Sequence, residues 1–328
     1  MSNVDLIYFL VPLVIASTVP LALVALGALF SERSGVINIA LEGIMLMGGF
    51  VGAVAIKTLE GTDIVVWMIV PVGLLIGAIV GVLFSLLHAF AAVNMKANQI
   101  ISATALNMFA PAFAIFTART FYGTQKVVIS GAYKISSVQL FGIDWLDLGK
   151  IPVIGDLFFQ AAYLSTYVGV LIFIVAVVVL YKTRFGLRLR SCGENPQAAD
   201  SLGINIYKIR YAGVLISGAL AGMGGVIFVL SFAVNFNATV SGFGFLALAV
   251  LIFGNWKPGR IVLAALFFGS MRVISSTYSI IPILEDLTIE SEIYSMLPYV
   301  ATLIVLAFVS KNSAAPRAAG EPYDPGKR

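Results

Sequence analysis

The stretch "SGVINIALEGIMLMGGFVGAVAI" (Ser34–Ile56) is almost entirely apolar. Its length suffices to cross a lipid bilayer, because a transmembrane helix needs about 20 such residues. Comparable blocks recur along the chain at residues 6–29, 36–56, 64–87, 99–117, 160–181, 211–231, 240–254, 261–281 and 294–310. Lipid forces each block to close its backbone hydrogen bonds internally, which predicts helices. The sequence therefore predicts an all-α, polytopic helical membrane protein with about nine membrane segments.

The composition supports this fold class over any soluble one. Of 328 residues, 60% are hydrophobic and only 11% are charged, and the mean hydropathy is +1.01. Soluble domains carry about 25% charged residues. The net charge of +4 is therefore better interpreted loop by loop than as a sign of nucleic-acid binding. Cys192 is the single cysteine, which excludes an intramolecular disulfide.

The seventh block is shorter than the others. Its uninterrupted part, "FLALAVLIFG" (Phe245–Gly254), covers about half of the residues that a crossing helix needs. The sequence therefore predicts one short or discontinuous segment. Counting it as a crossing places the basic residues that follow it, Lys257 and Arg260, on the side of the membrane that is richer in positive charge.

The distribution of basic residues predicts the orientation. If loop 182–210 is cytoplasmic, that side receives most of them: Arg33, Lys96, Lys182, Arg184, Arg188, Arg190, Lys208, Arg210, Lys257, Arg260, Lys311, Arg317, Lys327 and Arg328. The other side receives Lys57, Arg119, Lys126, Lys134 and Lys150. Cytoplasmic loops carry the excess of Lys and Arg, which places the N-terminus outside and the C-terminus in the cytoplasm.

This topology gives one transmembrane domain over residues 1–310, with a cytoplasmic loop at 182–210 and an outer loop at 118–159. Residues 311–328 form a cytoplasmic tail. Within the domain, "SGVINIALEGIM" (Ser34–Met45) aligns with "SGFGFLALAVLI" (Ser241–Ile252) and begins on the opposite side of the membrane. Such a pair suggests an inverted repeat, a common source of transporter binding sites. Four identities in twelve positions leave chance as the alternative.

The cytoplasmic loop contains signals for a short capped helix. Asn195 suits the N-cap, Pro196 the first helical position and Gly203 the C-terminal stop. Glu194 lies near the N-terminus of this helix, where the helix dipole favours an anion. A capped helix presented to the cytosol is typical of a docking element, whereas an ordinary basic loop is the alternative.

Two polar residues lie in the second apolar block. Asn38 and Glu42 are four residues apart and would share one face of a helix. Ionisable groups inside the membrane usually face a bundle interior or a wet cavity. One interpretation is a polar contact that lines or gates a path. The other is structural, with Glu42 accepting hydrogen bonds from Asn38 and nearby backbone to fix a broken helix.

Two further spans contain polar residues near the middle of the membrane. Asn107 suits either an interhelical hydrogen bond or a place on a path. Arg272 lies about 12 residues into its span and either pairs structurally or contacts the path. The pairs Gly48/Gly52 and Gly218/Gly222 predict close helix packing.

Several stretches together resemble one known family. "FGLRLRSCGENPQAADSLGINIYKIRYAGVLISGALAGMGG" (Phe185–Gly225) resembles the coupling loop and following helix of permease subunits of bacterial ABC importers, in the group that includes branched-chain amino acid, ribose and nucleoside permeases. The stretches Gly27–Phe50, Ser241–Gly259 and "APRAAGEPYDPGKR" (Ala315–Arg328) look most like the shorter of two permeases in nucleoside importers. The outer stretch Val138–Phe159 departs from any such pattern.

The resemblance implies a transport subunit in the bacterial plasma membrane, not an enzyme. The chain has no G-x-x-x-x-G-K-[ST] phosphate loop, so ATP and Mg would be bound by a separate ABC ATPase. That ATPase would dock on the predicted short helix and its ends: Glu194, Asn195, Pro196, Gln197, Asp200 and Gly203. The other implied partners are a second, related permease and an extracytoplasmic binding protein or lipoprotein that delivers substrate.

The substrate implied is a nucleoside, with a simple sugar such as ribose or a branched-chain amino acid as alternatives. Residues around the outer end of the short segment mix aromatic and amide groups, which suit a base and a ribose: Phe232, Asn235, Phe236, Asn237 and Phe243. Core packing is the alternative for each phenylalanine. A different class, an ion-coupled secondary transporter, would use Glu42 and Arg272 as its coupling charges.

Overall fold

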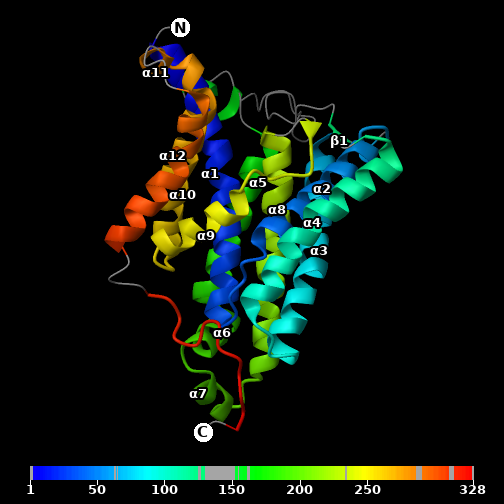
Figure 1. The fold of residues 1–328 in the computed structure, drawn as a ribbon, viewed down its shortest axis with the longest axis vertical. Coiled ribbons are helices and arrows are strands. Elements are labelled where there is room, and N and C mark those ends of the chain that lie inside the picture. Colours follow the sequence, from blue (N-terminus) through cyan, green and yellow to red (C-terminus); the bar gives the residue numbers. More distant parts are fainter. Residues whose placement is uncertain are drawn as a thin grey trace.

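The computed structural model describes residues 3–62, 64, 66–124, 127–129, 152–153, 155–160, 163–232, 235–285, 290–309 and 314–326. Most of the predicted outer loop, and the basic residues Lys126, Lys134, Lys150, Lys311, Lys327 and Arg328, lie outside these ranges. The described residues form an elongated helical molecule, with the N-terminus at one end and the C-terminus at the other (Figure 1).

Every predicted apolar block contains a helix. In chain order the helices are α1 (Asn3–Ser34), α2 (Leu41–Leu59), α3 (Val66–Ala89) with the π-helical turn η1 (Phe90–Asn94), α4 (Gln99–Tyr122), η6 (Gly155–Gln160), α5 (Leu164–Lys182), α6 (Arg184–Glu194), α7 (Pro196–Ser201), α8 (Ile206–Phe232), α9 (Phe243–Phe253), α10 (Pro258–Thr277), η7 (Tyr278–Ile280), α11 (Pro282–Glu285) and α12 (Ser291–Val309). The two-residue strands β1 (Val127–Val128) and β2 (Asn235–Phe236) pair antiparallel. The all-α fold class is confirmed.

Within the described part of the chain, seven helices are long and apolar enough to cross a membrane: α1, α2, α3, α4, α5, α8 and α10. Helix α9 has 11 residues, as the short seventh block predicts. Helix α12 covers the ninth block. The total of about nine segments and the orientation remain predictions.

The structure differs from the sequence prediction at the start of one helix and by one additional helix. The second helix begins only at Leu41, and residues 35–40, which we call the elbow, are not helical. Gly35 opens the elbow with φ +97°, a conformation that side-chain-bearing residues rarely adopt. The predicted cytoplasmic loop also contains a second helix, α6, which precedes the short capped one. Its amphipathic, Arg-rich sequence does not resemble a membrane span, which explains why the apolar pattern missed it.

Helix α8 lies in the middle of the bundle and packs closely on its neighbours through glycines (Figure 1). A Cβ atom added to Gly48 would come within 2.4 Å of the Gly222 Cα, and one added to Gly81 within 2.0 Å of the Gly218 carbonyl oxygen. These contacts place helix backbones directly against each other. The close packing predicted for the pairs Gly48/Gly52 and Gly218/Gly222 is confirmed.

Candidate functional site

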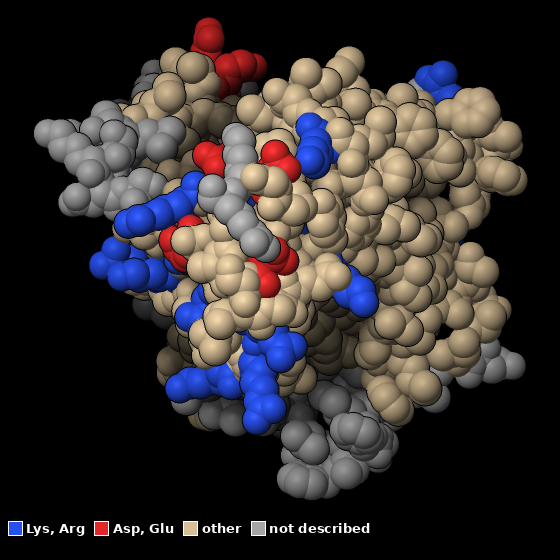
Figure 2. All heavy atoms as spheres, turned by 90° about the horizontal axis from the view of Figure 1, so that it is seen from below, with Lys and Arg blue, Asp and Glu red and all other residues tan. Residues whose placement is uncertain are grey.

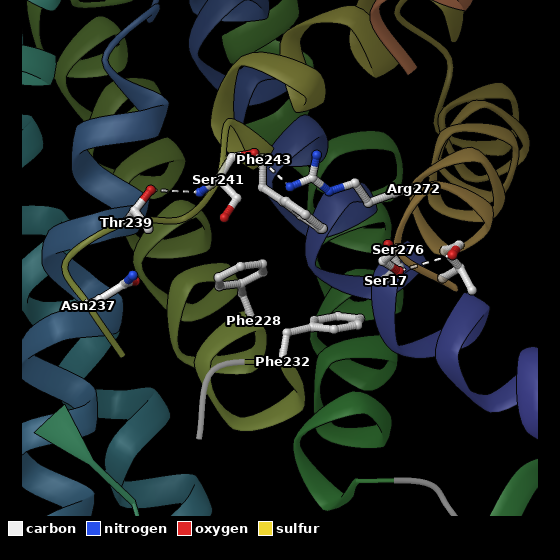
Figure 3. Close-up of a pocket in the computed structure, with 10 residues that line it drawn as sticks. Ser17, Phe228, Phe232, Asn237, Thr239, Ser241, Phe243, Arg272 and Ser276 are labelled. Carbon is white, nitrogen blue, oxygen red and sulfur yellow. Dashed lines mark hydrogen bonds between the residues drawn. The ribbon is translucent and has the colours of Figure 1, made fainter. Parts of the chain in front are cut away.

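A cavity of about 420 Å³ lies where α1, α8, α9 and α10 meet the segment between β2 and α9 (Figure 3). Its volume is within the range of small-molecule sites, about 300–1,000 Å³. The lining combines aromatic, hydroxyl, amide and cationic groups: Ser17, Phe228, Phe232, Asn237, Thr239, Ser241, Phe243, Arg272, Val273 and Ser276.

Three phenylalanine rings form the apolar wall of this cavity. The ring centroids of Phe228 and Phe243 are 4.6 Å apart, and those of Phe232 and Phe243 are 6.2 Å apart. Phe228 and Phe243 are buried, whereas Phe232 is 38% exposed. Such a cluster can stack against a flat ligand.

Arg272 supplies the cationic group of the cavity. Its guanidinium carbon lies 5.6 Å from the centroid of the Phe243 ring, and its Nη2 donates a 3.3 Å hydrogen bond to the Ser241 carbonyl (Figure 3). The sequence did not identify a partner for Arg272. One hydrogen bond to a carbonyl occupies one of the five guanidinium donors, and among the described residues no other hydrogen bond of this group is found, so donors remain for a ligand.

Ser17 contributes an unpaired polar group from α1. Its side chain is buried, and its hydroxyl has no hydrogen-bond partner among the described residues. An unpaired buried hydroxyl is costly unless something else, such as a ligand, supplies the missing bond.

The predicted aromatic and amide cluster is only partly brought together. Phe232, Asn237 and Phe243 line the cavity with Arg272. Phe236 does not, because it is fully buried and packs against Phe50 with ring centroids 6.4 Å apart. For Phe236, the alternative of core packing was therefore correct. The side chain of Asn235 lies outside the described residues.

Several cavity residues were not singled out in the sequence. Phe228 lies one helical turn before Phe232 on α8, and Ser276 lies one turn after Arg272 on α10. Helical periodicity around the predicted residues could have found both. Ser17, Thr239 and Ser241 carry no such signal, because their places depend on how distant segments pack.

The predicted shared helical face of Asn38 and Glu42 is wrong, because Asn38 precedes α2 and lies in the elbow. The Asn38 side chain is buried, donates to the Ser217 Oγ at 3.1 Å and accepts from the Ala40 amide at 3.1 Å. Its partners are therefore structural, and Glu42 is not one of the residues that it binds.

Glu42 instead binds the N-terminal end of α9. Its two carboxylate oxygens accept hydrogen bonds from the backbone amides of Gly242 at 2.9 Å, Gly244 at 2.6 Å and Phe245 at 3.3 Å. The first amides of a helix have no partner inside the helix. Glu42 thus satisfies three of them and fixes α9, which carries Phe243 into the cavity.

Asn107 makes the interhelical hydrogen bonds that one of its two interpretations predicted. From α4 it donates to the Ile39 carbonyl at 2.9 Å and accepts from the Gly43 amide at 2.8 Å. The Ile37 amide likewise donates to Gln99 at 2.7 Å, and the Ile37 carbonyl accepts from His88 at 2.9 Å. Side chains of α3 and α4 therefore satisfy the exposed backbone groups of the elbow, as an apolar environment requires.

At the opposite end of the molecule from α11, α7 is capped as predicted. The Asn195 side chain accepts from the Ala198 amide at 3.0 Å, Pro196 begins the helix, and Gly203 follows its end with φ +78°. Gln197 and Asp200 are exposed on it.

Glu194 directly precedes the N-cap residue Asn195 and so lies near the N-terminus of α7, as predicted. It ends α6 and forms a 2.9 Å ion pair with Arg33 at the end of α1. The adjacent Cys192 is buried, and burial raises the pKa of its thiol to about 11, so the thiol stays protonated at neutral pH. Both residues therefore stabilise the packing of α6.

Comparison with known proteins gives close relatives over the whole length. The nucleoside ABC transporter permease protein NupC of Lactococcus lactis is 41% identical over 98% of this chain and 99% of its own length. The guanosine ABC transporter permease protein NupQ of Bacillus subtilis is 39% identical over the full length of both chains. A third relative, the nucleoside ABC transporter permease protein NupB of Lactococcus lactis, is 23% identical over 77% of this chain and 68% of its own.

No solved structure matches the chain. The family described as "Branched-chain amino acid transport system / permease component" matches residues 11–306, which contain the elbow, the cavity and α7. Subunits of this kind imply ATPase and substrate-binding partners and a paired permease. The chain therefore belongs to the branched-chain amino acid transport system permease family, and it is a multi-pass permease of the plasma membrane.

Proposed function

We propose that the chain is the permease subunit of an ABC importer for nucleosides in a bacterial plasma membrane. The observation that carries this proposal is the cavity, in which three phenylalanine rings face hydroxyl, amide and guanidinium groups. A nucleoside has one flat aromatic part and one part rich in hydroxyls, and this lining complements both. The printed functions of the relatives NupC and NupQ support the same substrate class.

In this proposal the base stacks on the exposed face of Phe232 beside Phe243. The free guanidinium donors of Arg272 bind a base carbonyl, and the unpaired Ser17 hydroxyl binds a ribose hydroxyl. A binding protein or lipoprotein would deliver the nucleoside outside. A second permease of related sequence, as NupB is related to this chain, would complete the path.

The energy source in this proposal is a separate ATPase that binds ATP and Mg. It docks on α7, through Glu194, Asn195, Pro196, Gln197, Asp200 and Gly203. Figure 2 looks onto the end of the molecule that carries α7 and shows Lys and Arg side chains spread over it. This distribution supports a cytoplasmic place for that end and for the C-terminus, with the N-terminus outside.

The secondary-transporter alternative is less well supported by the geometry. Its coupling charges would be Glu42 and Arg272, but the Glu42 carboxylate is engaged by three backbone amides of α9. A simple sugar remains the main competing substrate within the ABC class. It would use the hydroxyl and amide groups but would leave much of the three-ring wall without a partner.

The test is transport by the assembled importer in proteoliposomes with a panel of nucleosides, ribose and leucine. Phe232→Ala should raise the nucleoside concentration needed for half-maximal uptake about tenfold, since one base–aromatic stack contributes about 1–3 kcal/mol. Phe245→Ala is the matched control, because Phe245 is also exposed and near the cavity but does not line it. Uptake of ribose or leucine without nucleoside uptake would overturn the substrate, and an equal response of both variants would overturn the site.

A further inference from the structure

We propose that the C-terminal tail, residues 314–326, forms part of the ATPase docking site, and that the ATPase contacts α7 and this tail as one surface. The proposal rests on the proposed function of α7. The tail lies beside α6 and α7 at the same end of the molecule (Figure 1). The tail follows the last apolar block and lies outside residues 11–306, which match the family.

Helix α7 needs support from outside itself. It has six residues, and isolated helices shorter than about 12–15 residues are marginal in water. Its inner face is buried in a small apolar cluster made of Cys192, Ala199, Ile206 and Tyr323. Tyr323 comes from the tail, is 7% exposed and packs edge-on against Tyr207. The tail therefore supplies the aromatic side chain that covers the inner face of α7.

The tail is fixed along its length by hydrogen bonds to three separate elements. The Ala314 amide donates to Asn255 at 2.7 Å, the Ala318 amide to the Gly193 carbonyl at 2.9 Å, and the Gly320 amide to the Gly35 carbonyl at 3.1 Å. These acceptors belong to the turn between α9 and α10, to α6 and to the elbow. Chain ends are usually poorly ordered unless they are tied down, and this one is tied down.

A buried arginine adds a fourth attachment. Arg210 on α8 is 1% exposed, and its Nη1 donates a 2.7 Å hydrogen bond to the Glu321 carbonyl of the tail. Among the described residues its Nε and Nη2 have no hydrogen-bond partner, so the Glu321 carbonyl is the acceptor that the structure gives this buried charge. The tail is thus integral to the packing of this end of the molecule and presents a fixed surface.

Between α7 and the tail lies a hollow of about 250 Å³. One wall comes from Glu194, Asn195, Pro196 and Gln197, and the other from Arg317, Ala318, Glu321, Pro322 and Tyr323. Because both walls border one hollow, a protein that enters it at the N-terminal end of α7 also meets the tail. Leu202, directly after α7, is 81% exposed, which leaves an apolar side chain for the same partner to cover.

Arg317 gives the sharpest test of the tail surface. Its side chain is exposed and lines the hollow, whereas the tail is attached through backbone groups and Tyr323. Arg317→Glu should therefore leave the fold unchanged and weaken ATPase binding about tenfold, or about 1.4 kcal/mol, because reversing a charge at an interface opposes association. Arg260→Glu makes the same charge change at an exposed position of α10 and serves as the matched control.

The measurement is the dissociation constant of the purified ATPase for the permease pair in lipid nanodiscs, for wild type, Arg317→Glu, Arg260→Glu, Asp200→Lys, Tyr323→Ala and Tyr323→Phe. We expect weaker binding for Arg317→Glu and Tyr323→Ala, with wild-type affinity for Arg260→Glu and near wild-type affinity for Tyr323→Phe, which keeps an aromatic ring in the cluster with Ala199.

The outcomes separate the two proposals. If wild-type permease does not bind the ATPase, the proposed function is wrong. If Asp200→Lys weakens binding but Arg317→Glu and Tyr323→Ala both bind like wild type, α7 docks alone and the role of the tail is wrong. If Arg317→Glu and Arg260→Glu weaken binding equally, the effect is general charge repulsion, and the tail surface is again rejected.

Discussion

Helices α2 and α9 follow similar sequences, but their N-terminal ends are stabilised by different contacts. Both follow a Ser-Gly pair whose glycine has positive φ, +97° at Gly35 and +79° at Gly242. After Gly35 the chain stays non-helical up to Leu41, whereas α9 begins directly after Gly242. The elbow is held by side chains from α3 and α4, while the end of α9 is held by Glu42 of α2.

This difference shows which of the two helix ends depends on the other for its stability. The two helices meet at Glu42 and run in opposite directions from it (Figure 1), which supports the inverted relation suggested by the sequence. The first copy supplies a carboxylate, and the second supplies amides and the cavity residue Phe243. Helix α9 therefore depends on α2, whereas α2 is stabilised independently by α4.

The largest loss of stability is expected for Glu42→Ala, which removes the contact between the two helix ends. It leaves the amides of Gly242, Gly244 and Phe245 without their acceptor, and each buried unpaired donor costs about 1–3 kcal/mol. The free energy of unfolding should fall by about 4 kcal/mol or more. Thermal unfolding in nanodiscs measures this loss, and Glu42→Gln, which keeps one carbonyl oxygen, should be intermediate. A wild-type melting temperature for Glu42→Ala would contradict the dependence of α9 on this carboxylate.

A smaller effect, confined to the elbow, is expected for Asn107→Leu. The change removes the partners of the Ile39 carbonyl and the Gly43 amide, at a cost of about 2–4 kcal/mol in total. Hydrogen exchange should accelerate at residues 39–44 and remain slow at the amides of Gly242–Phe245. Equal acceleration at both sites would show that the two ends are not stabilised independently.

The smallest effect is expected for Gly244→Ala, which forces the two ends apart. The added methyl group would lie 2.4 Å from backbone atoms of Glu42, and overpacking of this kind costs about 1–3 kcal/mol. Nucleoside affinity should fall together with stability, because Phe243 moves with α9. Gly259→Ala is the matched control, since its methyl group would meet nothing within 4 Å. Unchanged affinity in Gly244→Ala would mean that the cavity tolerates displacement of α9.

The candidate site was predictable in its residue types more than in its contacts. Phe232 and Phe243 could be selected because they lie with amides around the outer end of the short segment, and Arg272 because a charge inside an apolar span stands out. Ser17 could not, because a serine in an apolar helix is ordinary until neighbouring helices determine whether its hydroxyl has a partner. Phe236 shows the opposite case: its residue type suits a ligand site, but its ring packs against Phe50 and does not line the cavity.

The sequence by itself determined the membrane class, the helical blocks, the short α9 and the capped α7. These features follow from local chemistry, namely apolar length, Gly and Pro positions and an Asn cap. Only the tertiary structure decided the partners of Asn38, Glu42 and Glu194 and the attachment of the tail to α6 and Arg210. Those contacts join residues distant in the chain, and a pattern of nearby residues does not encode which distant backbone groups will be left unpaired and need an acceptor.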